Sequence, residues 1–197
     1  MKIESGSVIF LNGTSSSGKS TIAKALQKSL DEPYLHVSLD GFLNQLPIHY
    51  LENEKYLSGA LPILLAGFDA SNAGIARSGN NVIVDHVLQE PSWVAPCVKA
   101  FEGLDVVFVG VRCSLDILES REKARGDRQL GTARYQHDRV HSNKEYDVEV
   151  DTSGMTVEQC VSVIREYVCS GKRPTAFGRL RALLVGARAS MIPGHST

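Results

Sequence analysis

The most informative segment of this 197-residue chain reads Gly13-Thr14-Ser15-Ser16-Ser17-Gly18-Lys19-Ser20. It fits the pattern G-x-x-x-x-G-K-[ST] and lies between an apolar run at residues 7–11 and a segment with helical spacing at residues 19–30. Glycines allow the backbone to curl so that successive N–H groups face inward, and the N-terminus of the following helix attracts anions. The segment therefore predicts a phosphate-binding loop between a strand and a helix. The alternative is a Gly/Ser-rich turn that only caps the helix.

Within this loop we expect ATP to be bound by consecutive residues, namely Gly13, Thr14, Ser15, Ser16, Ser17, Gly18, Lys19, Ser20 and Thr21. Lys19 brings a full positive charge to the β and γ phosphates, and the hydroxyl of Ser20 is a ligand for Mg²⁺. We expect a second metal ligand at Asp85, which ends an apolar run, because open α/β sheets bind ligands at the carboxyl ends of their strands. Capping of a turn is the alternative role for Asp85. For His86 we expect a place in the acceptor pocket or in the packed core.

The rest of the chain alternates strand-like and helix-like segments. Apolar runs rich in β-branched residues lie at residues 7–11, 34–39, 81–87, 104–111 and 146–150, and helical spacing is found at residues 19–30, 58–77, 91–101, 114–123 and 156–167. Several runs are apolar on consecutive positions, as in strands that helices cover on both faces. We therefore predict a three-layer α/β fold with a parallel sheet of about five strands.

Composition excludes several classes of protein. Hydrophobic residues make up 43% and charged residues 22% of the chain, which is typical of a folded globular domain rather than of a disordered one. The formal net charge of −1 argues against bulk binding of nucleic acid. The longest strongly apolar stretch, residues 61–68, is shorter than the roughly 20 residues of a membrane helix. We expect a cytoplasmic protein without a membrane span, whose four cysteines are reduced and packed.

Two segments differ from the alternating pattern. Charge is dense around residues 121–144, where Gly126 and Gly131 interrupt the sequence, and this segment is predicted to be a lid on the sheet. It offers several arginines for the charge of a migrating phosphoryl group: Arg121, Arg125, Arg128, Arg134 and Arg139. From residue 172 to residue 197 the chain has five basic residues and no acidic one. We therefore divide the chain into a domain of residues 1–171 and a basic tail of residues 172–197, which folds back, binds a partner or frays.

A kinase for small molecules needs a carboxylate that accepts the proton of the attacking hydroxyl or orients its oxygen. Asp40 follows the apolar run at residues 34–39 and is the expected carboxylate; its alternative role is the N-cap of a helix that starts at Gly41. A GTPase is disfavoured, because the segment Asn143-Lys144-Glu145-Tyr146-Asp147 has one residue too many for the pattern Asn-Lys-x-Asp.

The acceptor is predicted to be an uncharged or weakly charged, partly apolar alcohol. Between residues 38 and 111 the chain has few basic side chains for an acceptor phosphate, namely Lys55, Arg77 and Lys99. The same region supplies apolar and aromatic side chains for a pocket: Phe42, Leu43, Leu46, Tyr50, Tyr56 and Trp93.

Four segments carry a resemblance to a known family. They are Ile9-Phe10-Leu11-Asn12-Gly13 with the phosphate-binding loop, Val109-Gly110-Val111-Arg112-Cys113, Arg121-Glu122-Lys123-Ala124-Arg125-Gly126-Asp127-Arg128 and Glu145-Tyr146-Asp147-Val148-Glu149-Val150-Asp151-Thr152. With Asp40 they resemble the chloramphenicol phosphotransferase family, which is related in fold to shikimate and adenylate kinases. The resemblance implies a fold of the P-loop kinase type and ATP-dependent phosphorylation of a drug-like alcohol, for which an antibiotic such as chloramphenicol is a candidate. It implies Asp40 as the general base and Arg125 and Arg128 as lid residues that contact phosphate. We add Lys19 to the catalytic residues and Mg²⁺ to the cofactors because of the chemistry of the loop.

Two other functions stay open at this stage. One is a nucleoside or nucleotide kinase, in which lid arginines also reach an acceptor phosphate. The other is a nucleotide-dependent binding module whose basic tail contacts an acidic partner. The identity of the acceptor, the choice between ATP and GTP and the oligomeric state are left open by the sequence.

Overall fold

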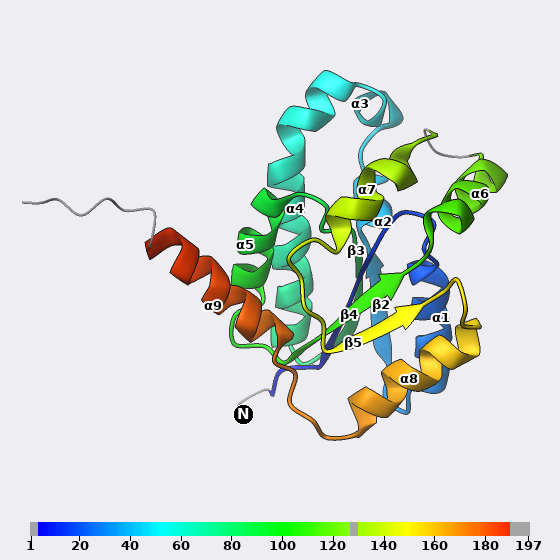
Figure 1. Cartoon of the computed structure of the whole chain (residues 1–197). Coiled ribbons are helices and arrows are strands. Elements are labelled where there is room, and N and C mark those ends of the chain that lie inside the picture. Colours follow the sequence, from blue (N-terminus) through cyan, green and yellow to red (C-terminus); the bar gives the residue numbers. More distant parts are fainter. Residues whose placement is uncertain (1–3, 127–129, 190–197) are drawn as a thin grey trace, which may run out of the picture.

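The computed structural model describes residues 4–126 and 130–189, with side chains up to residue 184. Its centre is a five-stranded sheet of order β2-β3-β1-β4-β5, in which every neighbouring pair is parallel (Figure 1). The strands are β1 (Val8–Gly13), β2 (Tyr34–Ser38), β3 (Asn81–His86), β4 (Val106–Arg112) and β5 (Val148–Asp151). The predicted parallel α/β sheet is confirmed.

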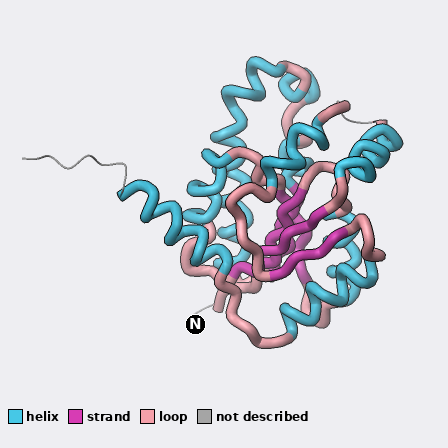
Figure 2. The backbone as a smooth tube through the Cα atoms, in the orientation of Figure 1, coloured by secondary structure: helices cyan, strands magenta, loops and turns pink. Residues whose placement is uncertain are grey.

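Helices cover both faces of this sheet, so that the molecule has three layers (Figure 2). The helices are α1 (Lys19–Ser29), α2 (Leu39–Leu43), α3 (Ile48–Leu51), α4 (Glu54–Arg77), α5 (Pro91–Ala100), α6 (Leu115–Arg125), α7 (Thr132–Val140), α8 (Val157–Cys169) and α9 (Ala176–Ala189). One face is covered by α4, α5 and α9, and the other face by α1 and α8.

The apolar residues of β1 explain why the sheet is covered twice. Val8 and Phe10 belong to the hydrophobic cluster beneath α4 and α5, whereas Ile9 and Leu11 belong to the cluster beneath α1 and α8. All four side chains are fully buried, and burial of such a side chain contributes about 1.5–3 kcal/mol. A strand that alternates between two apolar surroundings has to lie in the middle of the sheet.

Helix α4 is longer than its sequence pattern predicted, beginning at Glu54 rather than at residue 58. The side chain of Asn53 caps it by accepting a hydrogen bond from the Tyr56 N–H at 3.0 Å. By length and composition alone this helix could cross a membrane. Its second half instead carries Leu65, Phe68 and Ala73, which are buried against the sheet. The helix therefore serves here as a core element.

The described part of the basic tail is helical and packs against the body. Phe177 of α9 lies edge-on to Phe108 at a ring-centroid distance of 4.9 Å, and Leu180 is buried in the same cluster. The guanidinium of Arg181 donates to Glu102 at 2.8 Å. Apolar burial and an ion pair thus hold the first turns of α9 against the face of the sheet that α4 and α5 cover.

Candidate active site

The phosphate-binding loop joins β1 to α1 and needs glycine at both ends. A Cβ atom on Gly13 would lie 2.5 Å from the carbonyl oxygen of Val111 and 2.9 Å from the Ser17 hydroxyl, so no larger residue fits there. Gly18 precedes α1 with a φ of +93°, which side chains disfavour. Between them Ser16 also has a positive φ of 65°. These angles form the tight curl that the sequence pattern predicted.

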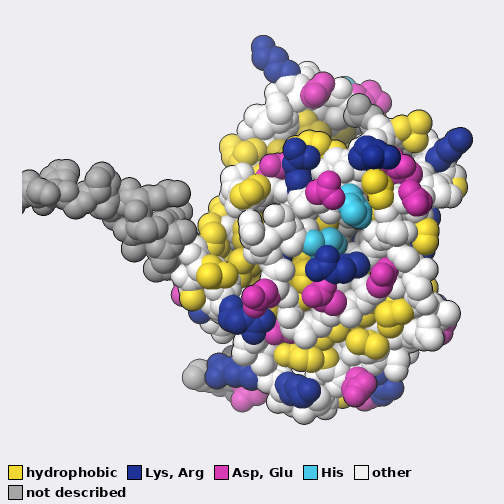
Figure 3. Space-filling view, viewed as in Figure 1, with side chains coloured by type: hydrophobic (Ala, Val, Ile, Leu, Met, Phe, Trp, Pro, Cys, Tyr) yellow, Lys and Arg dark blue, Asp and Glu magenta, His cyan; other side chains and the backbone are white. Residues whose placement is uncertain are grey.

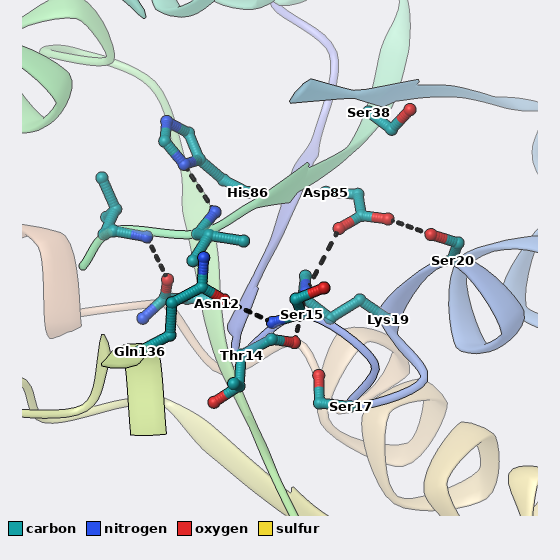
Figure 4. Close-up of polar contacts among 12 residues, drawn as sticks. Asn12, Thr14, Ser15, Ser17, Lys19, Ser20, Ser38, Asp85, His86 and Gln136 are labelled. Carbon is teal, nitrogen blue, oxygen red and sulfur yellow. Dashed lines mark hydrogen bonds and ion pairs between the residues drawn. The ribbon is translucent and has the colours of Figure 1, made fainter. Parts of the chain in front are cut away.

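Lys19 and Ser20 both face the carboxylate of Asp85 at the end of β3 (Figure 4). The Lys19 ammonium donates to the carbonyl of Thr14 at 2.9 Å and lies 3.8 Å from Asp85 Oδ1, and the Ser20 hydroxyl donates to Asp85 Oδ2 at 2.6 Å. Nε2 of His36 on β2 lies 3.7 Å from the same Oδ2. Burial raises the pKa of Asp85, but the positive charge of Lys19 and contacts with His36 and Ser20 outweigh burial and lower the pKa below its ordinary value. Asp85 is therefore ionised at neutral pH.

A cavity of about 460 Å³ lies beside the loop and brings most predicted site residues together. Its lining includes Ser15, Ser16, Gly18, Lys19, Ser20, Thr21, Asp40, Asp85 and Arg125. Gly13, Thr14 and Ser17 belong to the loop but are buried and do not line the cavity. Arg128 lies outside the described residues.

Asp40 is the second residue of α2 and is exposed at the edge of this cavity. Its alternative role as an N-cap is wrong, because the N-cap of α2 is Ser38, whose hydroxyl accepts a hydrogen bond from the Gly41 N–H at 3.1 Å. Helix α2 begins earlier than expected, since a serine at the end of β2 satisfies its first N–H groups. The carboxylate of Asp40 is thereby held on a helix rather than in a loop.

The lid arginines divide into two groups. Arg121 and Arg125 line the cavity. Arg134 instead pairs with Glu119 at 2.7 Å, and Arg139 lies 4.0 Å from the ring centroid of Tyr135. Such pairing fits the surface in Figure 3, where acidic and basic side chains are interspersed.

Arg121 is held by the segment that follows β5. Its guanidinium donates to the hydroxyl and the carbonyl of Thr152, both at 3.1 Å. The Thr152 hydroxyl in turn donates to the carbonyl of Ser17 at 2.9 Å. Arg121 therefore links helix α6 to the phosphate-binding loop through Thr152.

The aromatic residues expected in an acceptor pocket do not line this cavity. Phe42, Leu43 and Trp93 pack against the hydrophobic core, and Tyr50 and Tyr56 lie against each other with ring centroids 4.6 Å apart. The cavity beside the loop is lined by residues of the predicted nucleotide site, and the predicted acceptor side chains lie outside its lining.

His86 points away from Asp85 into the core, as the packed alternative predicted. It is 1% exposed, stacks on Phe10, and accepts a hydrogen bond from the Val87 N–H on Nδ1. Burial lowers its pKa to about 4, so the imidazole is neutral. Asp69 of α4 lies 3.6 Å from its Nε2, and burial raises the pKa of this carboxyl to about 7.

Sequence reasoning missed several residues that shape the site. His36 shares a face of the sheet with Asp85, because β2 pairs with β3 in a register that places Ser38 beside Asp85. Gln136 accepts a hydrogen bond from the Ser15 N–H at 2.7 Å. The signal for Gln136 was available, since Ala133, Gln136 and Val140 share the buried face of α7. A buried glutamine on an apolar helix face requires a polar partner.

The residues present fit a magnesium nucleotide. The hydroxyl of Ser16 is buried and finds no hydrogen-bond partner among the residues that the structure describes, as expected for a group that serves a ligand. Ser20 and Asp85 form a pair of oxygen atoms of the kind that hard divalent cations prefer. The curled loop and the ammonium of Lys19 fit the phosphates.

Comparisons with known proteins identify the family of this chain. Residues 6–169 match the family described as Chloramphenicol phosphotransferase-like protein. A protein of Mycobacterium tuberculosis with the name "Putative O-phosphotransferase" is 32% identical, with 89% of this chain and 88% of that protein covered.

Solved structures show the same fold at low sequence identity. The APS kinase of Mycobacterium tuberculosis in complex with AMPPNP and APS has a TM-score of 0.67 at 16% identity, with 84% of this chain and 98% of that chain covered. Shikimate kinase from Acinetobacter baumannii in complex with shikimate has a TM-score of 0.62 at 13% identity, with 87% and 96% covered. Together with the matched family and its loop geometry, these findings make the protein a small-molecule kinase that belongs to the chloramphenicol phosphotransferase-like protein family.

Proposed function

We propose that this kinase transfers the γ-phosphoryl group of ATP, with Mg²⁺, to a hydroxyl group of a small, uncharged or weakly charged molecule. The observation that supports this function is the lining of one cavity by Lys19, Ser20, Asp85 and Asp40. A phosphate-binding cation, a pair of metal-binding oxygens and a second carboxylate are the groups that phosphoryl transfer to an alcohol requires.

Each of these groups has a role that follows from its chemistry. Lys19 and the loop N–H groups bind the β and γ phosphates and position the γ phosphorus for attack. The acceptor oxygen forms a bond to this phosphorus while the bond to the β–γ bridging oxygen breaks, and ADP leaves. Asp40 accepts the proton of the attacking hydroxyl. Ser20 and Asp85 would hold Mg²⁺, which supplies positive charge to the phosphate oxygens.

Arginines of the lid support the same reaction. We propose that Arg125, which lines the cavity, and Arg128 contact phosphate oxygens when the segment at residues 121–144 closes on the nucleotide. A guanidinium stays charged when water is excluded and donates two hydrogen bonds at once.

The acceptor follows from the scarcity of basic side chains in the region from residue 38 to residue 111. Lys55 and Lys99 are exposed, and the guanidinium of Arg77 donates to the carbonyls of Ala100 and Glu102 at 2.8 and 3.1 Å. Arg77 thus secures the end of α4, and none of these three basic side chains lines the cavity that holds Asp40. We propose a neutral alcohol, with an antibiotic such as chloramphenicol as the first molecule to test, and the cytoplasm as the compartment in which ATP is met.

The test is a screen of neutral alcohols, sugars, nucleosides and nucleoside monophosphates for an ATP-dependent mass gain of one phosphoryl group. We expect a neutral alcohol to be modified and the Asp40→Asn variant to lose about a hundredfold or more in turnover, with the affinity for ATP unchanged within about threefold. The control is Asp31→Asn, which changes an exposed carboxylate that pairs with Arg165 and does not line the cavity, and which should keep full activity. Faster turnover of nucleosides or monophosphates would contradict the proposed acceptor, and an active Asp40→Asn variant would contradict the proposed base.

A further inference from the structure

Gln136 is the buried side chain that connects the lid to the phosphate-binding loop. It lies on α7, is 9% exposed, and its Oε1 accepts a hydrogen bond from the Ser15 N–H at 2.7 Å (Figure 4). Ser15 itself lines the nucleotide cavity. The contact therefore joins two elements that are 121 residues apart in the chain, at the start of the loop.

The direction of this hydrogen bond fixes the orientation of the carboxamide. A backbone N–H can only donate, so the atom of Gln136 that meets Ser15 has to be the oxygen. The Nε2 end is then turned away from the loop, and in the described part of the chain it makes no hydrogen bond that competes with this orientation. The side chain is thus held in one geometry with its acceptor directed at the loop.

Helix α7 is itself held at both ends, so Gln136 is presented from a rigid element. At its N-terminus the carboxylate of Glu122 accepts hydrogen bonds from the N–H groups of Gly131 and Ala133, both at 2.8 Å. At its C-terminus the carbonyl of Val140 accepts from the Asn12 side chain at 2.9 Å. Asn12 lies at the end of β1, immediately before the loop.

We propose that Gln136 is a positioning residue for phosphoryl transfer, which keeps the first turn of the phosphate-binding loop in the shape that receives a triphosphate. This inference takes one point from the proposed function, namely that the loop binds the phosphates of ATP. A loop that is already ordered loses less conformational freedom when the nucleotide binds, so the contact strengthens nucleotide binding without touching the nucleotide. Through the same contact, a nucleotide in the loop stabilises the docked position of α7.

The first measurement concerns the loop in the nucleotide-free protein. In Gln136→Met the side chain keeps its length and loses its acceptor, so the Ser15 N–H should exchange with solvent about tenfold faster than in the wild type. Gln136→Glu retains an acceptor at the same position and should restore slow exchange, which a loss of packing alone would not do. Equal exchange in wild type and Gln136→Met, or fast exchange in Gln136→Glu, would overturn the proposal.

The second measurement concerns nucleotide binding. Calorimetry with Mg²⁺ and ATP should show a dissociation constant about tenfold higher for Gln136→Met than for the wild type. The matched control is Tyr135→Phe on the same helix, which removes the hydrogen bond from the Tyr135 hydroxyl to Glu90 at 2.8 Å and leaves Gln136 in place. Its dissociation constant should stay within about twofold of the wild-type value.

Unchanged affinity in Gln136→Met, or an equal loss in Tyr135→Phe, would refute a specific role for Gln136. If Gln136→Met does not fold, Gln136→Asn serves instead, because a side chain shorter by one methylene group keeps its polarity and no longer reaches Ser15. Neither measurement needs an acceptor molecule, so failure of this inference is distinguishable from failure of the proposed transfer reaction.

Discussion

Removal of the carboxylate of Glu122 should weaken the lid by an amount that the structure allows us to work out. Glu122 is 2% exposed and caps α7, whose first N–H groups have no partner within the helix. In Glu122→Ala the buried N–H of Ala133 is left unpaired, which costs about 1–3 kcal/mol, and the helix N-terminus loses an anion worth about 0.3–1 kcal/mol. The N–H of the exposed Gly131 turns to water at little cost. We therefore expect the free energy of unfolding to fall by about 1–4 kcal/mol.

Urea unfolding followed by circular dichroism measures this loss. Glu122→Gln keeps one carbonyl oxygen for Ala133 and should lose only about 1 kcal/mol. The control is Glu119→Ala on α6, the helix that also carries Glu122. It removes the exposed ion pair with Arg134 and should lower the free energy of unfolding by no more than about 1 kcal/mol. The reasoning is refuted if Glu122→Ala is no less stable than Glu119→Ala, because the two hydrogen bonds would then contribute nothing beyond a surface ion pair.

Two other carboxylates give predictions of different kinds. Asp85→Asn should raise the Mg²⁺ concentration for half-maximal activity by about tenfold or more, because a neutral amide binds a divalent cation less strongly than a carboxylate does. Initial rates over a Mg²⁺ titration measure this concentration. If it is unchanged in the variant, Asp85 is not a metal ligand. Burial raises the pKa of the Asp69 carboxyl to about 7. Between about pH 4 and pH 7 the folded protein therefore keeps the proton of this carboxyl, whereas the unfolded chain loses it. The wild type consequently becomes less stable as the pH rises through this range. The free energy of unfolding of Asp69→Asn, relative to that of the wild type, should therefore increase by about 1–4 kcal/mol from pH 4 to pH 7. Urea unfolding of both proteins at several pH values measures this difference. A difference that does not change with pH would contradict the raised pKa.

The fold was largely predictable because local patterns and tertiary contacts agree in this chain. The consecutive apolar residues of β1 predict a buried parallel strand, and this strand is found. The loop that follows it is curled as its glycines predict, and it borders a cavity. Helix α3 was missed, and a helix in the place of α2 was considered only as an alternative that starts at Gly41. With four and five residues these helices are too short to show a helical period. The cap on Ser38 rather than Asp40 was missed for a related reason, since either residue type can start a helix and only the backbone geometry decides which one does.

The sequence by itself determined the chemistry of the loop, because the glycines, Lys19 and Ser20 are neighbours in the chain and act through local backbone geometry. Only the tertiary structure decided which distant groups join them. The strand order places β3 between β2 and β1, so that Asp85 meets Lys19 and Ser20 while His36 reaches it from the other side. The contact of Gln136 with Ser15 likewise depends on how α7 docks. Sequence spacing fixes neighbours along a helix or a strand, whereas partners more than a hundred residues apart are fixed by the packing of whole elements.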